Sequence, residues 1–339
     1  MVTTGNSSAA DALGAALAGA STAAQSMALL GDVDRQLKAI RNRTTTMGVN
    51  QTLVTDEMPY YNAWINAEGG RGELQNSSGN SGYELNSWGG TVGFDVDLEP
   101  TFTAGMAFSA MYGDLQMTGS DTAKGDLDTY YVSAFARYSD SGWTHTFIAT
   151  AGLADFKLNR SVAGMELEGE TSGTSFGLMY EAGRVIALDE DAQTCIQPMF
   201  NMSWRHTTMD GYSEKGSSAA LTVGEQTLDS VTIGLGARLQ TVAGESMYNR
   251  TSIFECRAMV KADLGDLGGS SEVALANYRE LVSPQKVKSS EMGAIGLEAG
   301  IGLTVPVGDE GGSIFMDASV EVRSDYRDVN GTLGYRVNF

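Results

Sequence analysis

The chain has 339 residues, with 42 acidic and 22 basic side chains and a net charge of −20. This balance argues against a nucleic-acid partner, because phosphate backbones are bound by faces rich in Lys and Arg. Glycine is abundant at 42 residues and proline scarce at 5, so the glycine excess must lie in ordered segments rather than in Pro/Gly-rich linkers. No run of about 18 apolar residues occurs, which excludes a transmembrane helix.

The beginning of the chain shows no export signal. Residues 1–30 contain no basic stretch followed by an apolar one, so no signal peptide is visible. The sequence therefore predicts either a cytosolic chain or a fragment of a longer exported precursor. Two cysteines, Cys195 and Cys256, are too few for a disulfide scaffold and lack the spacing of metal ligands. We expect no cofactor and no metal site.

The first 45 residues or so predict one helix. Ser8 followed by Asp11 is a capping-box pattern, and the segment then runs to Ile40 without proline. Its first part is mostly Ala, Gly and Ser, whereas its end is charged. A thin helix with a charged end suits a narrow polar space, although an Ala-rich surface helix or a flexible linker would show the same pattern. The basic residues at this end are Arg35, Lys38, Arg41 and Arg43.

From Tyr60 to the last residue, apolar side chains recur with a period of two. In 231–239 and in 295–305 every second residue is aliphatic, and the residues between are glycine, threonine or charged. Strict alternation of this kind predicts strands with one apolar and one polar face. About twelve strands are expected, near 61–73, 87–98, 101–116, 126–138, 142–157, 172–188, 194–209, 227–242, 250–265, 290–307, 312–324 and 329–339.

The connections between these strands alternate between short ones and mostly longer polar ones, such as 210–226 and 266–289; the last, 325–328, is short. Many strands reach ten residues or more, the length that crosses a bilayer core when tilted, whereas soluble strands average about 5–6. Backbone groups in a membrane must all be paired, which requires a closed sheet. The predicted fold is an all-β, 12-stranded antiparallel transmembrane β-barrel (46–339), with the N-terminal α-helix (1–45) in its lumen.

If the apolar faces meet lipid, the other faces enclose a lumen rich in charges of both signs. A dry apolar core could not accept so many charges, but a wet or plugged lumen can pair them. We therefore expect the basic end of the helix to lie among lumen carboxylates, and glycines such as Gly234, Gly236 and Gly300 to make room inside. The predicted lumen charges are Glu68, Asp95, Asp97, Glu181, Arg205, Arg238, Glu255, Arg257, Lys261, Asp263, Glu298, Asp317, Glu321, Arg323 and Arg336.

The last strand places Leu333, Tyr335, Val337 and Phe339 on one face. With the linker VDRQLKAIRNR, the segments WGGTVGFDVDL and YYVSAFARYSD, and the terminal GTLGYRVNF, the chain resembles the C-terminal translocator domains of autotransporters, the type V secretion family of Gram-negative outer membranes. The resemblance spans nearly the whole chain. The terminal motif is shared by many outer-membrane barrels, whereas the order of helix and then twelve strands is typical of the family.

The resemblance implies a barrel that exports an N-terminal passenger to the cell surface, with outer-membrane lipid, periplasmic chaperones and the barrel assembly machinery as partners. The four residues of the terminal face would be the assembly signal. The sequence has neither signal peptide nor passenger and so looks like an excised translocator. Some family members cut their passenger off at an asparagine inside the lumen; Asn42 and Asn50 lie in the corresponding region, but no Asn-Asn pair is present.

Two other function classes fit parts of the pattern: a porin-like passive channel with residues 1–45 in the periplasm, and a soluble β-rich adhesion module. An enzyme is not expected. His145 and His206 are the only histidines, and Asp210, four residues after His206, could lie near it only if the loop between them folds back. No GxSxG, HExxH or phosphate-cradling motif occurs. The tryptophans are expected in interfacial girdles: Trp64, Trp88, Trp143 and Trp204.

Overall fold

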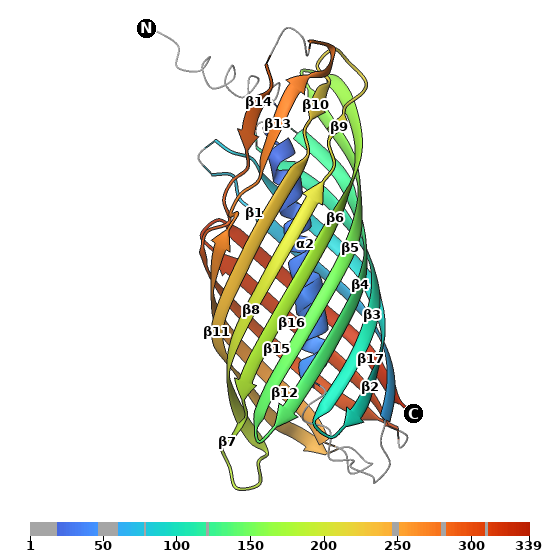
Figure 1. The fold of residues 1–339 in the computed structure, drawn as a ribbon, viewed down its shortest axis with the longest axis vertical. Coiled ribbons are helices and arrows are strands. Elements are labelled where there is room, and N and C mark those ends of the chain that lie inside the picture. Colours follow the sequence, from blue (N-terminus) through green and yellow to red (C-terminus); the bar gives the residue numbers. More distant parts are fainter. Residues whose placement is uncertain are drawn as a thin grey trace.

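The computed structural model describes residues 19–46, 60–77, 79–119, 122–245, 251–278, 283–308 and 311–339. One α-helix, α2 (Thr22–Thr46), runs inside a closed β-barrel (Figure 1). Within these ranges, no helix is both long and apolar enough to cross a bilayer. The capping pattern at Ser8 and Asp11 lies outside the described residues. In the described part the chain enters the helix at Gly19, whose φ of +67° is a left-handed conformation that glycine adopts without strain.

The barrel wall in the described chain consists of twelve long antiparallel strands, which confirms the predicted architecture. Neighbours in sequence pair with one another, and β17 pairs with β1 from Asn62–Asn338 to Leu74–Tyr326, so the sheet closes. A two-residue strand, β7 (Ile186–Ala187), pairs with β8 in a short turn. The wall strands are β1 (Tyr60–Leu74), β2 (Gly82–Glu99), β3 (Phe102–Thr118), β4 (Thr122–Asp140), β5 (Trp143–Val162), β6 (Met165–Arg184), β8 (Thr194–Met209), β11 (Gln226–Glu245), β12 (Thr251–Gly265), β15 (Ile295–Val307), β16 (Gly312–Arg323) and β17 (Tyr326–Asn338).

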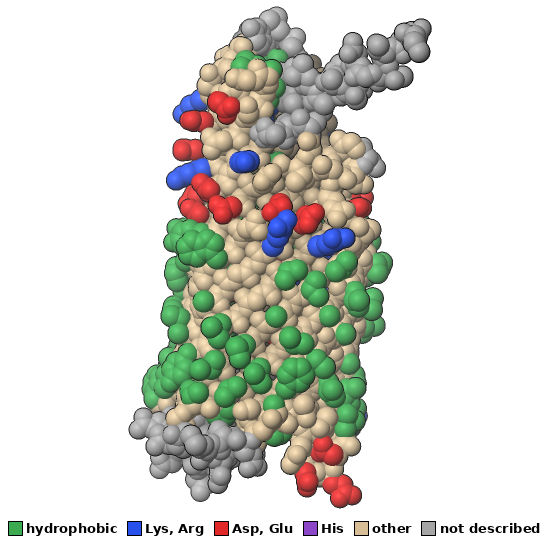
Figure 2. All heavy atoms as spheres, turned by 180° about the vertical axis from the view of Figure 1, so that it is seen from behind, with side chains coloured by type: hydrophobic (Ala, Val, Ile, Leu, Met, Phe, Trp, Pro, Cys, Tyr) green, Lys and Arg blue, Asp and Glu red, His purple; other side chains and the backbone are tan. Residues whose placement is uncertain are grey.

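From the short-turn end to the middle of the barrel, the wall has apolar side chains outside and charged side chains inside, the reverse of a soluble protein. Leu153 on β5 is 65% exposed, and Leu235 on β11 is 64% exposed, whereas the charged residues between such positions face inward. Figure 2, which views the opposite face of the barrel from Figure 1, shows apolar side chains as a broad belt with charged side chains above it. An exposed apolar belt of this height suits lipid and would be a severe aggregation hazard in water.

Above the belt the polarity of the wall reverses, which the sequence pattern did not predict. On β4, Leu127 points inward and is 2% exposed, whereas Asp126 faces outward. The same reversal occurs at Leu85, Leu115 and Phe156, which are all buried inside. Several strands are therefore longer at this end than expected: β2 begins at 82 rather than 87. This rim lies outside the lipid, so it has an apolar interior and a polar exterior, as a soluble barrel does.

Two segments predicted as polar loops, 210–226 and 266–289, contain strands instead. The strands β9 (Tyr212–Ser213), β10 (Leu221–Val223), β13 (Ser270–Leu275) and β14 (Gln285–Lys288) form a separate sheet in the order β14-β13-β10-β9, which we call the cap sheet. A 3₁₀ turn, η1 (Ala276–Tyr278), follows β13. Each strand is too short for its alternation to stand out in a sequence. The cap sheet lies at the end of the barrel with the long connections (Figure 1).

Candidate functional site

The lumen, filled by α2, is the candidate functional site. Every residue from Ser21 to Thr44 is buried, so the wall surrounds the helix on all sides. The helix runs from the long-connection end, where the Gln226 amide donates to the Thr22 carbonyl at 3.2 Å, to the short-turn end, where Arg43 meets Asp95. The helix therefore occupies the whole described path through the barrel.

The first half of α2 lies in an apolar zone. Met27, Leu29 and Leu30 are fully buried in one cluster with side chains of the wall and of the cap sheet. At Gly173 on β6, an added Cβ would come within 3.2 Å of the Leu29 Cδ2 atom, so this glycine allows close approach of the helix. The cap and wall residues in this cluster include Tyr83, Leu115, Phe156, Leu221, Val223, Val273 and Met292.

The second half of α2 is held by buried ion pairs to the wall. Arg35 donates to Asp328 on β17 at 2.7 Å and to the Ser87 hydroxyl at 2.6 Å. Lys38 contacts Glu321 on β16 at 2.7 Å and Asp34, one turn earlier on the helix, at the same distance. Removing one partner from such a pair leaves an uncompensated buried charge and typically costs about 3–5 kcal/mol. These contacts therefore fix both the depth and the rotation of the helix.

The last turn of the helix continues this pattern. The Arg41 guanidinium is 2.5 Å from Glu298 on β15, and the Arg43 guanidinium is 3.2 Å from Asp95 on β2. Arg43 also lies between two inward-facing rings: its Cζ atom is 5.2 Å from the Trp64 ring centroid and 5.5 Å from that of Phe315. Cation–π contacts of this kind strengthen when water is excluded. Trp64 thus faces the lumen, not the interfacial girdle in which the sequence placed it.

A second set of charges lies within the wall itself. Arg238 on β11 reaches Glu181 at 3.0 Å and Glu255 at 3.1 Å, and Arg257 reaches Asp317 at 2.6 Å. Lys261 contacts two carboxylates that also pair with helix cations, Glu321 at 2.8 Å and Glu298 at 3.0 Å. Arg205 is 3.0 Å from Asp34 on the helix, and Arg323 contacts Asp263 on the wall. Most acceptors therefore share two or more cations, and the helix is one member of a continuous network.

The glycines predicted to make room for the helix have a different role. An added Cβ at Gly300 would lie 2.5 Å from the Arg257 guanidinium carbon, and at Gly234 it would lie 2.4 Å from the Met259 sulfur. These glycines let long wall side chains lie flat across the neighbouring strand. The glycine that approaches the helix at this depth is Gly177 on β6, where a Cβ would be 2.9 Å from Leu37.

The structure places all the predicted lumen charges on the inner face. Glu68 accepts a hydrogen bond from Thr91, and Arg336 donates to Asn62. Three acids that do matter for the helix were not predicted as site residues. Asp32 accepts from Tyr131 and Thr129, Asp34 pairs with Lys38, and Asp328 lies in β17 rather than in the connection 325–328. Asp32 and Asp34 could have been found as charges on the predicted plug helix.

Around the middle of α2, the opposite side of the lumen, formed by β3 to β6, meets the helix with neutral side chains. The Gln36 amide donates to the Ser109 hydroxyl on β3 at 2.7 Å. Leu37 and Ile40 pack in a small apolar cluster with wall side chains that point inward. The helix therefore has two faces that match two halves of the wall, which is a further restraint on its rotation. The wall members of the cluster are Trp64, Ala107, Phe135, Ile148 and Met179.

The two asparagines considered for chain cleavage have separate outcomes. Asn50 lies outside the described residues. Asn42 lies in α2; its amide nitrogen donates to Asp317 at 2.6 Å, and its oxygen accepts from Arg41 at 3.2 Å. These contacts hold the side chain in the network, and cleavage after Asn42 stays a prediction.

The histidines and cysteines lie away from the lumen contacts of the helix. His145 is 2.8 Å from the Tyr180 hydroxyl, and His206 pairs with Asp229 at 3.0 Å. Both cysteines are free. Within the described ranges, no group of three or more His, Cys, Asp or Glu side chains has the arrangement of a metal site.

The last strand is an integral part of the wall. Leu333 is 55% exposed, Tyr335 44% and Phe339 69%, all on the outer surface. The backbone of Phe339 exchanges hydrogen bonds with Tyr61 on β1 at 3.0 and 3.3 Å, and its ring stacks near Tyr61. Val337 pairs in register with Ala63 on β1.

Comparison with solved structures finds the same barrel in secretion proteins. The translocator domain of the autotransporter NalP from Neisseria meningitidis matches with a TM-score of 0.70 at 17% identity, over 94% of this chain and 99% of that one. The beta domain of the Bordetella autotransporter BrkA matches with a TM-score of 0.62 at 15% identity, over 83% and 100%. The transport unit of AIDA-I from Escherichia coli gives 0.57 at 13% identity, over 87% and 97%. At these identities the matches establish the fold.

The two curated sequence relatives described next match less than half of this chain. Esterase EstA from Pseudomonas aeruginosa is 28% identical over 166 residues, which are 47% of this chain and 25% of the relative. An uncharacterized protein of Pseudomonas putida is 30% identical over 161 residues, 46% of this chain and 26% of the relative. The matched part is thus about a quarter of the length of these curated relatives. The family model described as the autotransporter beta-domain matches residues 63–319, and the chain therefore belongs to the autotransporter beta-domain family.

Proposed function

We propose that this barrel carries a passenger, attached on the N-terminal side of α2, across the outer membrane and that α2 then closes the pore. The chain is an outer-membrane translocator domain of a Gram-negative bacterium, consistent with its family and its apolar belt. The observation that carries the proposal is the position of α2, which fills the lumen with its start at the long-connection end. In outer-membrane barrels the long connections are extracellular. A chain that precedes α2 would therefore emerge at the cell surface.

The two alternative functions are not favoured. A porin-like channel needs an open lumen, but here the helix occupies it and pairs with its charges. A soluble adhesion module needs a polar exterior, but here the belt exposes many large apolar side chains. The division into a plug segment (1–45) and a barrel (46–339) remains part of the proposal.

The identity of the passenger is a separate question. The relative named Esterase EstA is matched over a quarter of its length. Because that name states an esterase activity, an esterase is the passenger class to test first.

Assembly is also part of the proposal. The barrel assembly machinery would bind the outward-facing row of β17, which includes Leu333, Tyr335, Val337 and Phe339. Before the barrel closes, β17 and β1 are both edge strands, and an edge with aromatic anchors can add to another sheet by β-augmentation. Periplasmic chaperones would protect the belt on the way.

The test is surface display. A reporter domain fused before α2 in an exported chain should become accessible to added protease on whole cells, and the same reporter fused to a chain that lacks β17 should not. If the reporter stays inside while the barrel inserts normally, the barrel is not a translocator.

Purified barrel in planar bilayers should pass little current, and a porin-like current from the intact chain would contradict the plug.

A further inference from the structure

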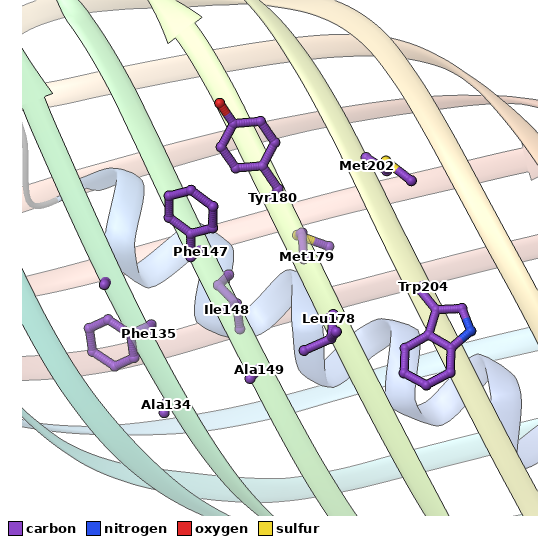
Figure 3. A pocket seen from close by; sticks show the side chains of 11 residues that line it. Ala134, Phe135, Phe147, Ile148, Ala149, Leu178, Met179, Tyr180, Met202 and Trp204 are labelled. Carbon is purple, nitrogen blue, oxygen red and sulfur yellow. The ribbon is translucent and has the colours of Figure 1, made fainter.

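We propose that the outer wall carries a binding site for a phospholipid of the inner leaflet, with one acyl chain in an apolar groove across β4, β5, β6 and β8 and the phosphate at Arg184. The groove has a volume of about 540 Å³, within the range of sites that hold small molecules. Figure 3 shows the groove and its lining residues.

The groove is built from small residues between large ones. Ala134 on β4 pairs in register with Ala149 on β5, which pairs with Leu178 on β6. These alanines leave a depression, because Phe147, Tyr180 and Trp204 stand beside it on the same outer surface (Figure 3). Apart from the Tyr180 hydroxyl and the Trp204 indole nitrogen, the side chains around the groove are hydrocarbon or thioether. A flexible hydrocarbon chain fits such walls, and a polar ligand does not.

In a membrane, burial against protein gives an acyl chain no hydrophobic gain, because it leaves other lipid tails behind. A preference for this groove must come from close packing on several sides and from the head group. The head group is therefore the deciding feature, and it must lie where the groove reaches the membrane surface.

A line of ring contacts joins the groove to a cationic group at the short-turn end of the barrel. The ring centroids of Phe147 and Tyr180 lie 4.7 Å apart, those of Tyr180 and His145 6.1 Å, and those of His145 and Trp143 6.4 Å. The guanidinium of Arg184 lies 5.7 Å from the Trp143 ring centroid, and Arg184 is exposed. Among the described residues, Arg184 forms no ion pair within 4.0 Å, so its charge is available to a phosphate.

This end of the barrel is the one with short turns, which in outer-membrane barrels face the periplasm. The lipid is therefore a glycerophospholipid of the inner leaflet rather than lipopolysaccharide of the outer one. Trp143 and Tyr138 flank the position, as aromatic side chains do at a bilayer interface.

The experiment is native mass spectrometry of the barrel in mild detergent, titrated with palmitoyl-oleoyl-phosphatidylglycerol and separately with lipid A. The double variant Ala134→Leu/Ala149→Leu fills the groove and should weaken retention of the phospholipid about tenfold. Arg184→Gln should weaken it about fivefold, the effect of one basic residue at a lipid surface. Matched controls are Ala258→Leu, an outward alanine on β12, and Arg327→Gln, an exposed arginine at the opposite rim.

Both controls should retain the phospholipid as the wild type does, and heat-modifiable gel mobility should show that every variant is folded. Equal retention by the wild type and the groove-filling variant would overturn the site. Tighter retention of lipid A than of phosphatidylglycerol would overturn its assignment to the inner leaflet. Either result would leave the translocator proposal unaffected, because that proposal concerns the lumen.

Discussion

Arg41 on α2 and Glu298 on β15 are joined by a 2.5 Å ion pair, and neither side chain is more than 2% exposed. The Lys261 ammonium of the wall also contacts Glu298 at 3.0 Å, so Arg41 of the helix joins an ion pair that lies within the wall. This arrangement resolves a conflict within a translocator. The wall must be stable while the lumen is occupied by other chain, and it must still prefer its own helix afterwards. While other chain occupies the lumen, wall cations such as Lys261 keep the wall carboxylates paired. When α2 enters, its own cations pair with the same carboxylates.

Arg41→Ala should therefore destabilise the helix-filled barrel by about 2–4 kcal/mol, less than the full cost of breaking an isolated buried pair, because Lys261 remains with Glu298. The measurement is the midpoint of urea unfolding in detergent micelles. The matched control is Arg71→Ala: Arg71 pairs with Glu84 at 2.7 Å on the outer surface, where it is 56% exposed. That change should cost less than about 1 kcal/mol. Equal losses in the two variants would show that the lumen network does not hold the helix.

Removal of the helix should leave a cation-selective pore. In the described wall, ten inward carboxylates face seven inward cations, apart from the Arg160–Glu214 pair at the cap sheet. The helix adds four cations and two carboxylates. The carboxylates are Glu68, Asp95, Asp97, Glu181, Glu255, Asp263, Glu298, Asp317, Glu321 and Asp328, and the cations are Arg137, Arg205, Arg238, Arg257, Lys261, Arg323 and Arg336.

A chain that lacks residues 1–46 should conduct in planar bilayers, and its reversal potential in a salt gradient should favour cations, because the excess of carboxylates attracts them. The intact chain in the same bilayer is the control and should conduct little. An anion-selective current would contradict the charge argument, and an unchanged current would contradict the plug.

The period of two was enough to predict the part of the wall that lies in lipid, because there the membrane forces apolar side chains outward, as at Leu235. It failed above the belt, where Leu127 and Phe156 turn inward and the solvent reverses the pattern. The cap sheet was missed for a related reason, since its strands are stabilised by contacts with Leu29 and other residues distant in sequence.

The pairing of each helix cation could not be predicted either. That Arg35 meets Asp328, 293 positions away, depends on how deep the helix sits and how it is rotated. Sequence reasoning predicted that lumen carboxylates would surround the basic end, but the depth and rotation of the helix also depend on the fit of Leu37 against Gly177 and of Leu29 against Gly173. These are tertiary packing contacts, and no local pattern encodes them.

The apolar zone around the first half of α2 should act as the seal against ions. Leu29→Asn places an amide among hydrocarbon side chains, and burial of such a group without partners costs about 2–4 kcal/mol. We expect more frequent open events in single-channel recordings of the intact chain. Leu29→Met conserves the volume and should behave as the wild type does, with a cost below about 1.5 kcal/mol. Equal leakage from both variants would place the seal elsewhere in the lumen.

The last residue should matter more for assembly than for the finished barrel. Phe339 is 69% exposed, so Phe339→Ala removes little packing and should change stability in detergent by less than about 1 kcal/mol. If the assembly machinery reads the outward row of β17, the loss of its aromatic anchor should slow the appearance of the heat-resistant form about tenfold in proteoliposomes that contain the machinery. Val322→Ala, on the outer surface of β16, removes an apolar group outside that row and should fold at the wild-type rate. A slow phase that also appears during folding into detergent alone would attribute the effect to the contact of Phe339 with Tyr61 within the barrel, not to recognition.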